Sequence, residues 1–171
     1  VPEIAVNDAQ DAIPLCKALS DGGLPVAEIT FRTSAAEEAI RLVHEQLPDV
    51  ILGAGTVLTC EQVDRAIAAG LNINIGTLNR RTMASMVRAG KTANEKGIPV
   101  VPGCGNPSDI EVALSLGLKT VKFFPAEALG GLKLIKAIAA PYVDVTFMPT
   151  GGINEKNLVE YLSFKKIVAC G

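Results

Sequence analysis

Residues 117–125 read Gly-Leu-Lys-Thr-Val-Lys-Phe-Phe-Pro, a short β-type run bounded by a glycine and a proline. Such a run predicts a buried strand of a sheet. Lys122 stands inside this run, where an ammonium must find a partner or lose its proton. A lysine whose charge is disfavoured suits Schiff-base chemistry, because only the free amine attacks a carbonyl. The alternative is a buried, ion-paired lysine, and the surrounding sequence has to decide between the two.

Similar short apolar runs lie on both sides of this one, and amphipathic stretches separate them. The eight predicted strands are 1–6, 26–31, 50–57, 72–75, 98–102, 120–124, 143–148 and 166–169. They start roughly 22 to 26 residues apart, which is the length of one strand–helix unit. Eight such units predict an α/β fold, a parallel (β/α)8 TIM barrel, with a doubly wound open sheet as the alternative. We expect a single compact barrel domain over residues 1–171, without the terminal helices.

Polar residues precede several of the predicted helices at the spacing of a capping box. The four candidates are Asn7-x-x-Gln10, Ser34-x-x-Glu37, Thr59-x-x-Gln62 and Ser108-x-x-Glu111.

The composition indicates a globular chain with a core, since 49% of its 171 residues are apolar, 20% are charged and the net charge is −2. No basic block suggests binding to nucleic acid or to an anionic membrane. No apolar run is long enough to span a bilayer, and no signal peptide is recognisable at Val1. We therefore expect a cytoplasmic protein without nucleic-acid or membrane partners.

Cysteine and histidine positions argue against a metal site. Cys16, Cys60, Cys104 and Cys170 show neither a CxxC pair nor metal-ligand spacing, and this is typical of reduced core thiols. His44, the single histidine, lies in a helical pattern. A histidine-based triad or a typical zinc site cannot be built from these residues.

Reactive groups gather where the predicted strands end, which is where barrel enzymes place their active sites. In the second run, alternation puts Glu28, Thr30 and Arg32 on one face. Glu28 is placed to shuttle protons, and Arg32 near Lys122 would further disfavour the ammonium. Mutual neutralisation of Glu28 and Arg32 is the alternative. The third run ends in Gly53-Ala54-Gly55-Thr56, which places a hydroxyl at the barrel mouth.

Residues 149–154 read Pro-Thr-Gly-Gly-Ile-Asn and precede a predicted helix. A glycine pair at a helix N-terminus presents free N–H groups, which predicts a phosphate site at Gly151 and Gly152, with a simple tight turn as the alternative. Two other patterns, Gly53-x-Gly55 and Gly103-x-Gly105, lack the third glycine of a dinucleotide fingerprint, so we expect no nicotinamide cofactor.

Five segments together resemble the bacterial 2-keto-3-deoxy-6-phosphogluconate (KDPG) aldolases, also called 4-hydroxy-2-oxoglutarate (KHG) aldolases. They occur in family order over nearly the whole chain. The segments are Ala-Glu-Ile-Thr-Phe-Arg-Thr at 27–33, Gly-Ala-Gly-Thr-Val-Leu at 53–58, Val-Val-Pro-Gly at 100–103, Val-Lys-Phe-Phe-Pro-Ala-Glu at 121–127, and Pro-Thr-Gly-Gly-Ile-Asn at 149–154.

The resemblance implies a role for each predicted site residue. Lys122 would be the Schiff-base lysine and Glu28 the acid/base, while Arg32 and Thr56 would bind the pyruvyl carboxylate. Thr150 and Phe124 would line the substrate pocket, and Gly151 and Gly152 would cradle phosphate. The family is class I, so no metal and no cofactor is implied, and its members are usually cytoplasmic homotrimers. Glu3 departs from the family, whose first strand is usually apolar.

The predicted function is therefore that of a lyase, a class I aldolase that cleaves KDPG to pyruvate and glyceraldehyde 3-phosphate and also acts on 4-hydroxy-2-oxoglutarate. Three alternatives stay open. They are a 2-keto-3-deoxy-6-phosphogalactonate aldolase, a phosphate-binding barrel isomerase or synthase that forms no imine, and a non-catalytic sugar-phosphate binder.

Overall fold

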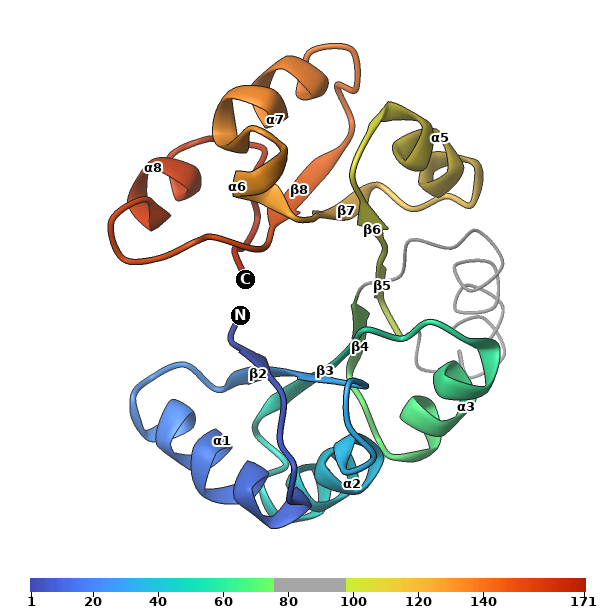
Figure 1. The fold of residues 1–171 in the computed structure, drawn as a ribbon, viewed down its shortest axis with the longest axis vertical. Coiled ribbons are helices and arrows are strands. Elements are labelled where there is room, and N and C mark those ends of the chain that lie inside the picture. Colours follow the sequence, from blue (N-terminus) through green and yellow to red (C-terminus); the bar gives the residue numbers. More distant parts are fainter. Residues whose placement is uncertain (76–97) are drawn as a thin grey trace. The chain divides into compact units, whose positions relative to one another are not determined.

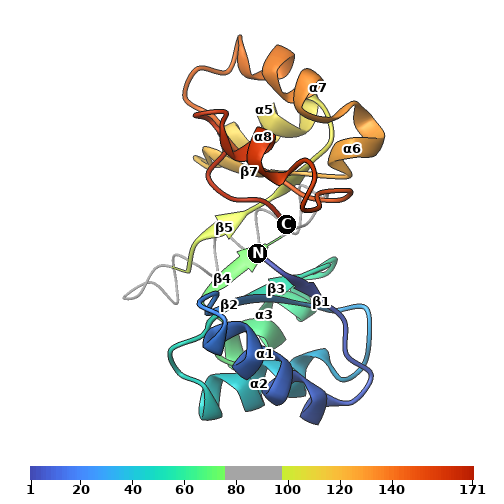
Figure 2. The same ribbon diagram turned by 90° about the vertical axis from the view of Figure 1, so that its left-hand side faces the viewer.

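The computed structural model describes residues 1–75 and 98–171, which form two compact units that divide after Val100 (Figures 1 and 2). The helix expected between the fourth and fifth strands falls within 76–97 and lies outside the described residues. The single domain expected over 1–171 stays a prediction.

The first unit alternates strands and helices along the chain, as the sequence predicts. Strands β1 to β4 pair in parallel, and the order in the sheet, β1-β2-β3-β4-β5, follows the chain. Helices α1, α2 and α3 lie on one side of this sheet (Figures 1 and 2). The elements are β1 (Glu3–Ile4), the 3-10 helix η1 (Ala9–Asp11), α1 (Ala12–Asp21), β2 (Val26–Thr30), α2 (Ala36–Gln46), β3 (Ile51–Gly55), α3 (Cys60–Ala68), β4 (Ile73–Ile75) and β5 (Val100–Val101).

The register of β2 places Glu28 beside Glu3 of β1 and Gly53 of β3. Its neighbours Ala27 and Ile29 are fully buried in the apolar core of this unit. The alternation along β2 therefore separates core-forming residues from Glu28, as the sequence predicts.

The second unit repeats the same alternation around a smaller parallel sheet, with strand order β6-β7-β8. Figure 1 shows β7 and β8 side by side, with α7 beside them. The elements are β6 (Gly103–Cys104), α5 (Pro107–Ser115), β7 (Thr120–Phe123), α6 (Ala126–Leu129), α7 (Gly131–Ala139), β8 (Thr146–Pro149) and α8 (Leu158–Leu162).

The predicted closed (β/α)8 TIM barrel is wrong: the described residues form two parallel sheets, one of five strands and one of three. The predicted fifth strand stops short of Pro102, which has no N–H to donate to a ladder. Of the predicted residues 98–102, only β5 forms a strand, and it belongs to the first sheet, whereas β6 begins just beyond the predicted end and pairs with β7. The predicted eighth strand forms only an isolated bridge, from Ile167 to Phe147. Both sheets keep chain order, so the doubly wound alternative, whose order reverses, is not observed either.

Helix starts show which capping signals work. Thr59 and Gln62 form the predicted capping box at α3. At α5 the cap is Asn106 rather than Ser108, because Pro107 fits the first turn of a helix. Asp8, rather than Asn7, caps η1. No helix within residues 1–75 and 98–171 combines the length and apolar character needed to cross a membrane.

Candidate active site

Burial singles out the predicted reactive residues. Among the described residues, the buried polar or charged side chains are Glu28, Thr30, Lys122 and Thr150. Burying such groups costs free energy, so a fold keeps them where they are partnered or used. Three of these four are predicted site residues, and they come from both units.

In the first unit, the Glu28 side chain lies against the backbone of Gly55. Glu28 is fully buried on β2, and Gly55 ends the neighbouring strand β3. A Cβ atom built on Gly55 would stand 2.1 Å from Glu28 Oε1 and 2.8 Å from its Cδ. The missing side chain at Gly55 therefore leaves the space that the carboxylate occupies. Sequence reasoning missed this role, although adjacent parallel strands with an acid on one and a glycine near the end of the next were visible in the pattern.

Arg32 follows β2 and makes an ion pair with Glu3, through Nη2 and Oε1. The mutual neutralisation of Glu28 and Arg32 considered from the sequence is therefore not what the structure shows for Arg32. The Arg32 side chain is 48% exposed even with this ion pair. Glu3, which departs from the family pattern, thus has a defined contact at the edge of the candidate site. The same region is tied together by Thr30, whose hydroxyl donates to the Ile4 carbonyl at 3.0 Å.

Thr56 has a left-handed backbone conformation, with φ of 53°. Left-handed backbone is rare for a β-branched residue and costs on the order of 1–3 kcal/mol. Strain of this kind is kept where the surrounding structure fixes it, often at a functional site. The sequence located the hydroxyl at the end of β3 but gave no sign of this strain.

In the second unit, Lys122 lies in the middle strand, with Gly103 of β6 on one side and Met148 of β8 on the other. Lys122 is 5% exposed, and its Nζ atom stands 5.7 Å from the centre of the Phe124 ring. A ring face at this distance favours a cation. The predicted strand position and burial of Lys122 are confirmed.

The end of β8 leads into Thr150, Gly151 and Gly152. The buried Thr150 hydroxyl has no hydrogen-bond partner within the described part of the chain. Both glycines have left-handed backbone, with φ of 93° and 83°. Phe124 packs against Gly151, since a Cβ there would be 3.4 Å from two of its ring carbons. The second unit thus brings Lys122, Phe124 and this turn into one chain of contacts.

The helix expected directly after the glycine pair begins instead at Leu158. Asn154 forms a side-chain turn there, accepting from the Lys156 N–H at 2.9 Å, and this delays the helix. The Gly151 N–H points to the Gly171 carbonyl at 3.4 Å. The Gly152 N–H makes no hydrogen bond to any described residue. Any anion held here would rely on the turn rather than on a helix N-terminus.

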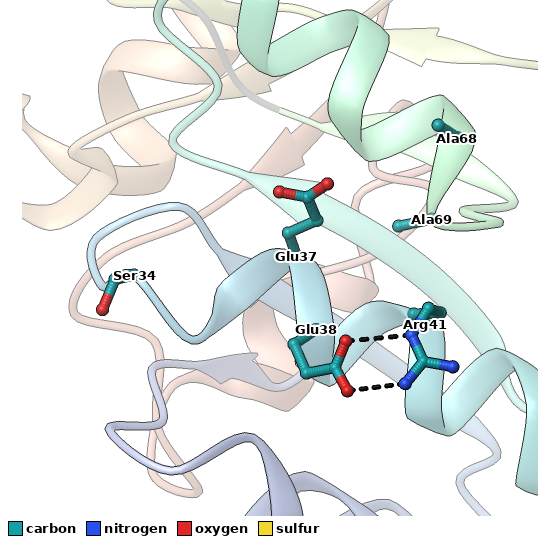
Figure 3. Close-up of a pocket in the computed structure, with 6 residues that line it drawn as sticks. All are labelled: Ser34, Glu37, Glu38, Arg41, Ala68 and Ala69. Carbon is teal, nitrogen blue, oxygen red and sulfur yellow. Dashed lines mark hydrogen bonds and ion pairs between the residues drawn. The ribbon is translucent and has the colours of Figure 1, made fainter.

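A surface hollow in the first unit carries none of the predicted site residues (Figure 3). Its charged side chains are ion-paired: Arg41 pairs with Glu38, and Glu37 pairs with Arg65, each at 2.6 Å. The hydrogen bond from Arg41 also lowers the pKa of Glu38. The hollow is lined by Ser34, Glu37, Glu38, Arg41, Ala68 and Ala69.

Neither metal ligands nor disulfides appear among the described residues. No group of three or more His, Cys, Asp or Glu side chains there could hold a metal ion. All four cysteines are free thiols, and Cys16, Cys104 and Cys170 are buried. Burial, with a contribution from Asp109, raises the pKa of Cys104 to about 12, so this thiol stays neutral near pH 7.

Comparison with known proteins decides the family. A family model described as KDPG and KHG aldolase matches residues 1–171. The chain belongs to this aldolase family. The 2-dehydro-3-deoxy-phosphogluconate aldolase of Haemophilus influenzae is 46% identical over all of this chain and 78% of its own length. The family predicted from the five segments is confirmed.

Two solved aldolase structures resemble the chain closely. The KDPG aldolase of Legionella pneumophila, with pyruvate captured as a covalent carbinolamine intermediate, is 38% identical with a TM-score of 0.88, and the match covers 99% of this chain and 80% of that one. The KDPG aldolase of Zymomonas mobilis ZM4 with 3-phosphoglycerate is 36% identical with the same TM-score, and the match covers 99% and 78%.

Proposed function

We propose that this chain is a class I aldolase, a lyase that cleaves KDPG to pyruvate and glyceraldehyde 3-phosphate and also cleaves 4-hydroxy-2-oxoglutarate to pyruvate and glyoxylate. Membership of the KDPG and KHG aldolase family carries this proposal. The predicted aldolase function agrees with the names of the relatives, which include a 2-dehydro-3-deoxy-phosphogluconate aldolase at 46% identity. The carbinolamine of the Legionella enzyme is the species formed when an amine adds to the ketone of pyruvate.

In the proposed mechanism, the Lys122 amine adds to the C2 ketone of the substrate. The carbinolamine loses water to give an iminium, with Glu28 moving the protons. Glu28, through a water molecule, then takes the proton of the C4 hydroxyl. The C3–C4 bond breaks, its electron pair enters the iminium to form an enamine, and the aldehyde leaves. The enamine takes a proton at C3, and hydrolysis releases pyruvate and restores the amine. No step requires a metal or an organic cofactor.

The remaining predicted residues would hold the substrate. Arg32 would bind the carboxylate, since a guanidinium can form two parallel hydrogen bonds to it. Two features support Thr56 and Thr150 as further contacts: the strained backbone of the first and the buried, unpartnered hydroxyl of the second. Phe124 would line the pocket beside Lys122, and Gly151 and Gly152 would hold the phosphate through the turn.

The assembly and location belong to the same proposal. We expect a cytoplasmic homotrimer that binds a phosphorylated keto acid and pyruvate, as the family resemblance implies. Light scattering after gel filtration should give a mass near three times the 17.8 kDa of the chain. A mass near that of a single chain would contradict the trimer but would not bear on the proposed reaction.

A side-by-side turnover assay tests the function. Pyruvate release should be fastest from KDPG, and slower from its galactonate epimer and from 4-hydroxy-2-oxoglutarate. Faster release from the galactonate epimer would show that the epimer, and not KDPG, is the preferred substrate. Absence of pyruvate from all three, in folded protein, would overturn the aldolase and favour an isomerase or a binding protein.

A further inference from the structure

The turn at Gly151–Gly152 is held from one side by Glu127 of α6. The Glu127 N–H donates to the Gly151 carbonyl at 3.1 Å, and the preceding Ala126 N–H donates to the Thr150 carbonyl at 2.8 Å. The side chain packs on the turn as well, because a Cβ on Gly152 would stand 2.6 Å from both Cβ and Cγ of Glu127. The backbone N–H groups of Ala126 and Glu127, together with the Glu127 side chain, therefore fix this turn.

The Glu127 side chain is itself held by Tyr161 of α8. Tyr161 is 2% exposed, and its hydroxyl donates to Glu127 Oε1. Burial and the hydrogen bond to Glu127 raise the pKa of Tyr161, so the hydroxyl remains a donor throughout the neutral range. Gly131, with φ of 62°, leaves room for the pair, since a Cβ there would be 2.8 Å from Glu127 Oε1 and 3.1 Å from the Tyr161 oxygen.

Two asparagine side chains hold the opposite side of the turn. The Asn154 and Asn157 amides donate to the Gly152 carbonyl at 3.2 and 3.1 Å. The Gly152 carbonyl is thus anchored, while its N–H makes no hydrogen bond to a described residue. With the carbonyls fixed, the direction of the peptide N–H groups is fixed as well, which is how a preorganised anion site gains affinity.

We propose that Tyr161 and Glu127 are positioning residues that set the preference for phosphorylated substrates, by holding the Gly151–Gly152 turn in the conformation that receives the phosphate. This inference rests on the proposed function, because it assigns the turn to the phosphate end of KDPG. Glu127 packs on the turn and Tyr161 holds Glu127, and the proposed mechanism gives neither residue a role in bond cleavage. Loss of the pair should therefore weaken binding of the phosphorylated substrate and spare the shorter one.

The two tyrosines of the chain provide a matched test. Tyr161→Phe removes one hydroxyl from a tyrosine–glutamate pair beside the turn. Tyr142→Phe removes the same group from the other pair, in which Tyr142 donates to Glu111 at 3.0 Å on an exposed surface. A hydrogen bond to a charged group is worth roughly tenfold or more in an equilibrium. Tyr161→Phe should raise KM for KDPG about tenfold and leave kcat and KM for 4-hydroxy-2-oxoglutarate within about twofold. Tyr142→Phe should change neither substrate.

Glu127 variants and inorganic phosphate give a second, independent readout. Glu127→Gln keeps an acceptor oxygen and the packing on Gly152, so it should behave close to wild type, whereas Glu127→Ala should match or exceed Tyr161→Phe. Competitive inhibition by inorganic phosphate should weaken in Tyr161→Phe and Glu127→Ala but not in Tyr142→Phe.

Equal losses on both substrates, or an unchanged ratio between them in Tyr161→Phe, would overturn the inference while leaving the aldolase intact. A wild-type protein that releases pyruvate from neither substrate would instead remove the proposed function itself. Thermal unfolding of each variant shows whether a loss comes from a damaged fold.

Discussion

In the first unit the candidate groups are side chains, whereas in the second unit a lysine side chain is joined by a turn that offers its backbone. Glu28 occupies space left by Gly55, and Thr56 holds its hydroxyl on strained backbone. The Gly151–Gly152 turn depends on Glu127 from the next helix. An added methyl group should therefore have different effects in the two regions. In the first unit it should slow the chemical step, and in the second it should weaken binding of the phosphate end of the substrate.

The largest effect is expected from Gly55→Ala. The added methyl would displace the Glu28 carboxylate, whose Oε1 lies 2.1 Å from that position. General acid–base catalysis is worth about 10²–10⁴-fold, so kcat should fall by at least about 10²-fold on both KDPG and 4-hydroxy-2-oxoglutarate.

Gly53→Ala is the matched control on the same strand. Its methyl would meet the flexible end of Ile75, 2.7 Å away, rather than a reactive group. Its main effect should be a lower melting temperature, with a much smaller loss of kcat than in Gly55→Ala. Equal losses of kcat in both variants would mean that β3 tolerates no methyl at all, and Gly55 would have no special tie to Glu28.

The corresponding change in the second unit is Gly152→Ala. It adds a methyl to left-handed backbone and against Glu127 at 2.6 Å, so KM for KDPG should rise tenfold or more while 4-hydroxy-2-oxoglutarate is affected little. Gly117→Ala carries a similar backbone strain, with φ of 79°, but its methyl would meet nothing within 4 Å. It should cost stability only. A loss shared equally by both substrates in Gly152→Ala would show that the glycines merely shape the chain.

Thr56→Gly should separate stability from binding. Glycine relieves the left-handed strain of about 1–3 kcal/mol and loses part of that gain to chain entropy, leaving a protein more stable by about 1 kcal/mol. The lost hydroxyl should raise KM for pyruvate-derived substrates several-fold, roughly the worth of one hydrogen bond. Denaturant unfolding and steady-state kinetics measure both quantities. A less stable glycine variant would show that Thr56 is not strained.

Arg32→Lys should have the smallest effect, a rise of a few-fold in KM for pyruvate with the fold unchanged, because lysine cannot reproduce the two parallel hydrogen bonds of a guanidinium. Glu3→Gln tests whether the ion pair with Glu3 matters instead, and such a half-exposed pair contributes about 0–1 kcal/mol. If Glu3→Gln and Arg32→Lys raise KM equally, the role of Arg32 is to pair with Glu3 rather than to bind the substrate carboxylate.

The sequence predicted individual strands better than their assembly. The run around Lys122 became the middle strand of the second sheet, because apolar β-type residues bounded by a glycine and a proline favour one local structure. Closure into a barrel depends on pairing between distant strands, which periodicity does not report. Pro102 and the single bridge at Ile167 are the places where that pairing departs from the prediction.

Residue type and strand position led to Lys122 and Glu28, whose burial the structure confirms and whose roles stay predictions. The candidate site was missed where the role belongs to absent or distant atoms. Gly55 acts through a Cβ that it lacks, and Tyr161 reaches Glu127 across 34 positions of sequence. The helix expected after Gly152 was displaced by the side-chain turn of Asn154, a local competition that a glycine pattern cannot reveal.

Borohydride trapping tests most directly whether Lys122 forms the imine. The folded protein is incubated with pyruvate, reduced with borohydride, digested and mapped by mass spectrometry. We expect one reduced pyruvyl group on the peptide that carries Lys122, loss of KDPG cleavage in step with its formation, and no adduct in Lys122→Arg. An adduct on another lysine, or full activity after borohydride and pyruvate, would contradict this role of Lys122.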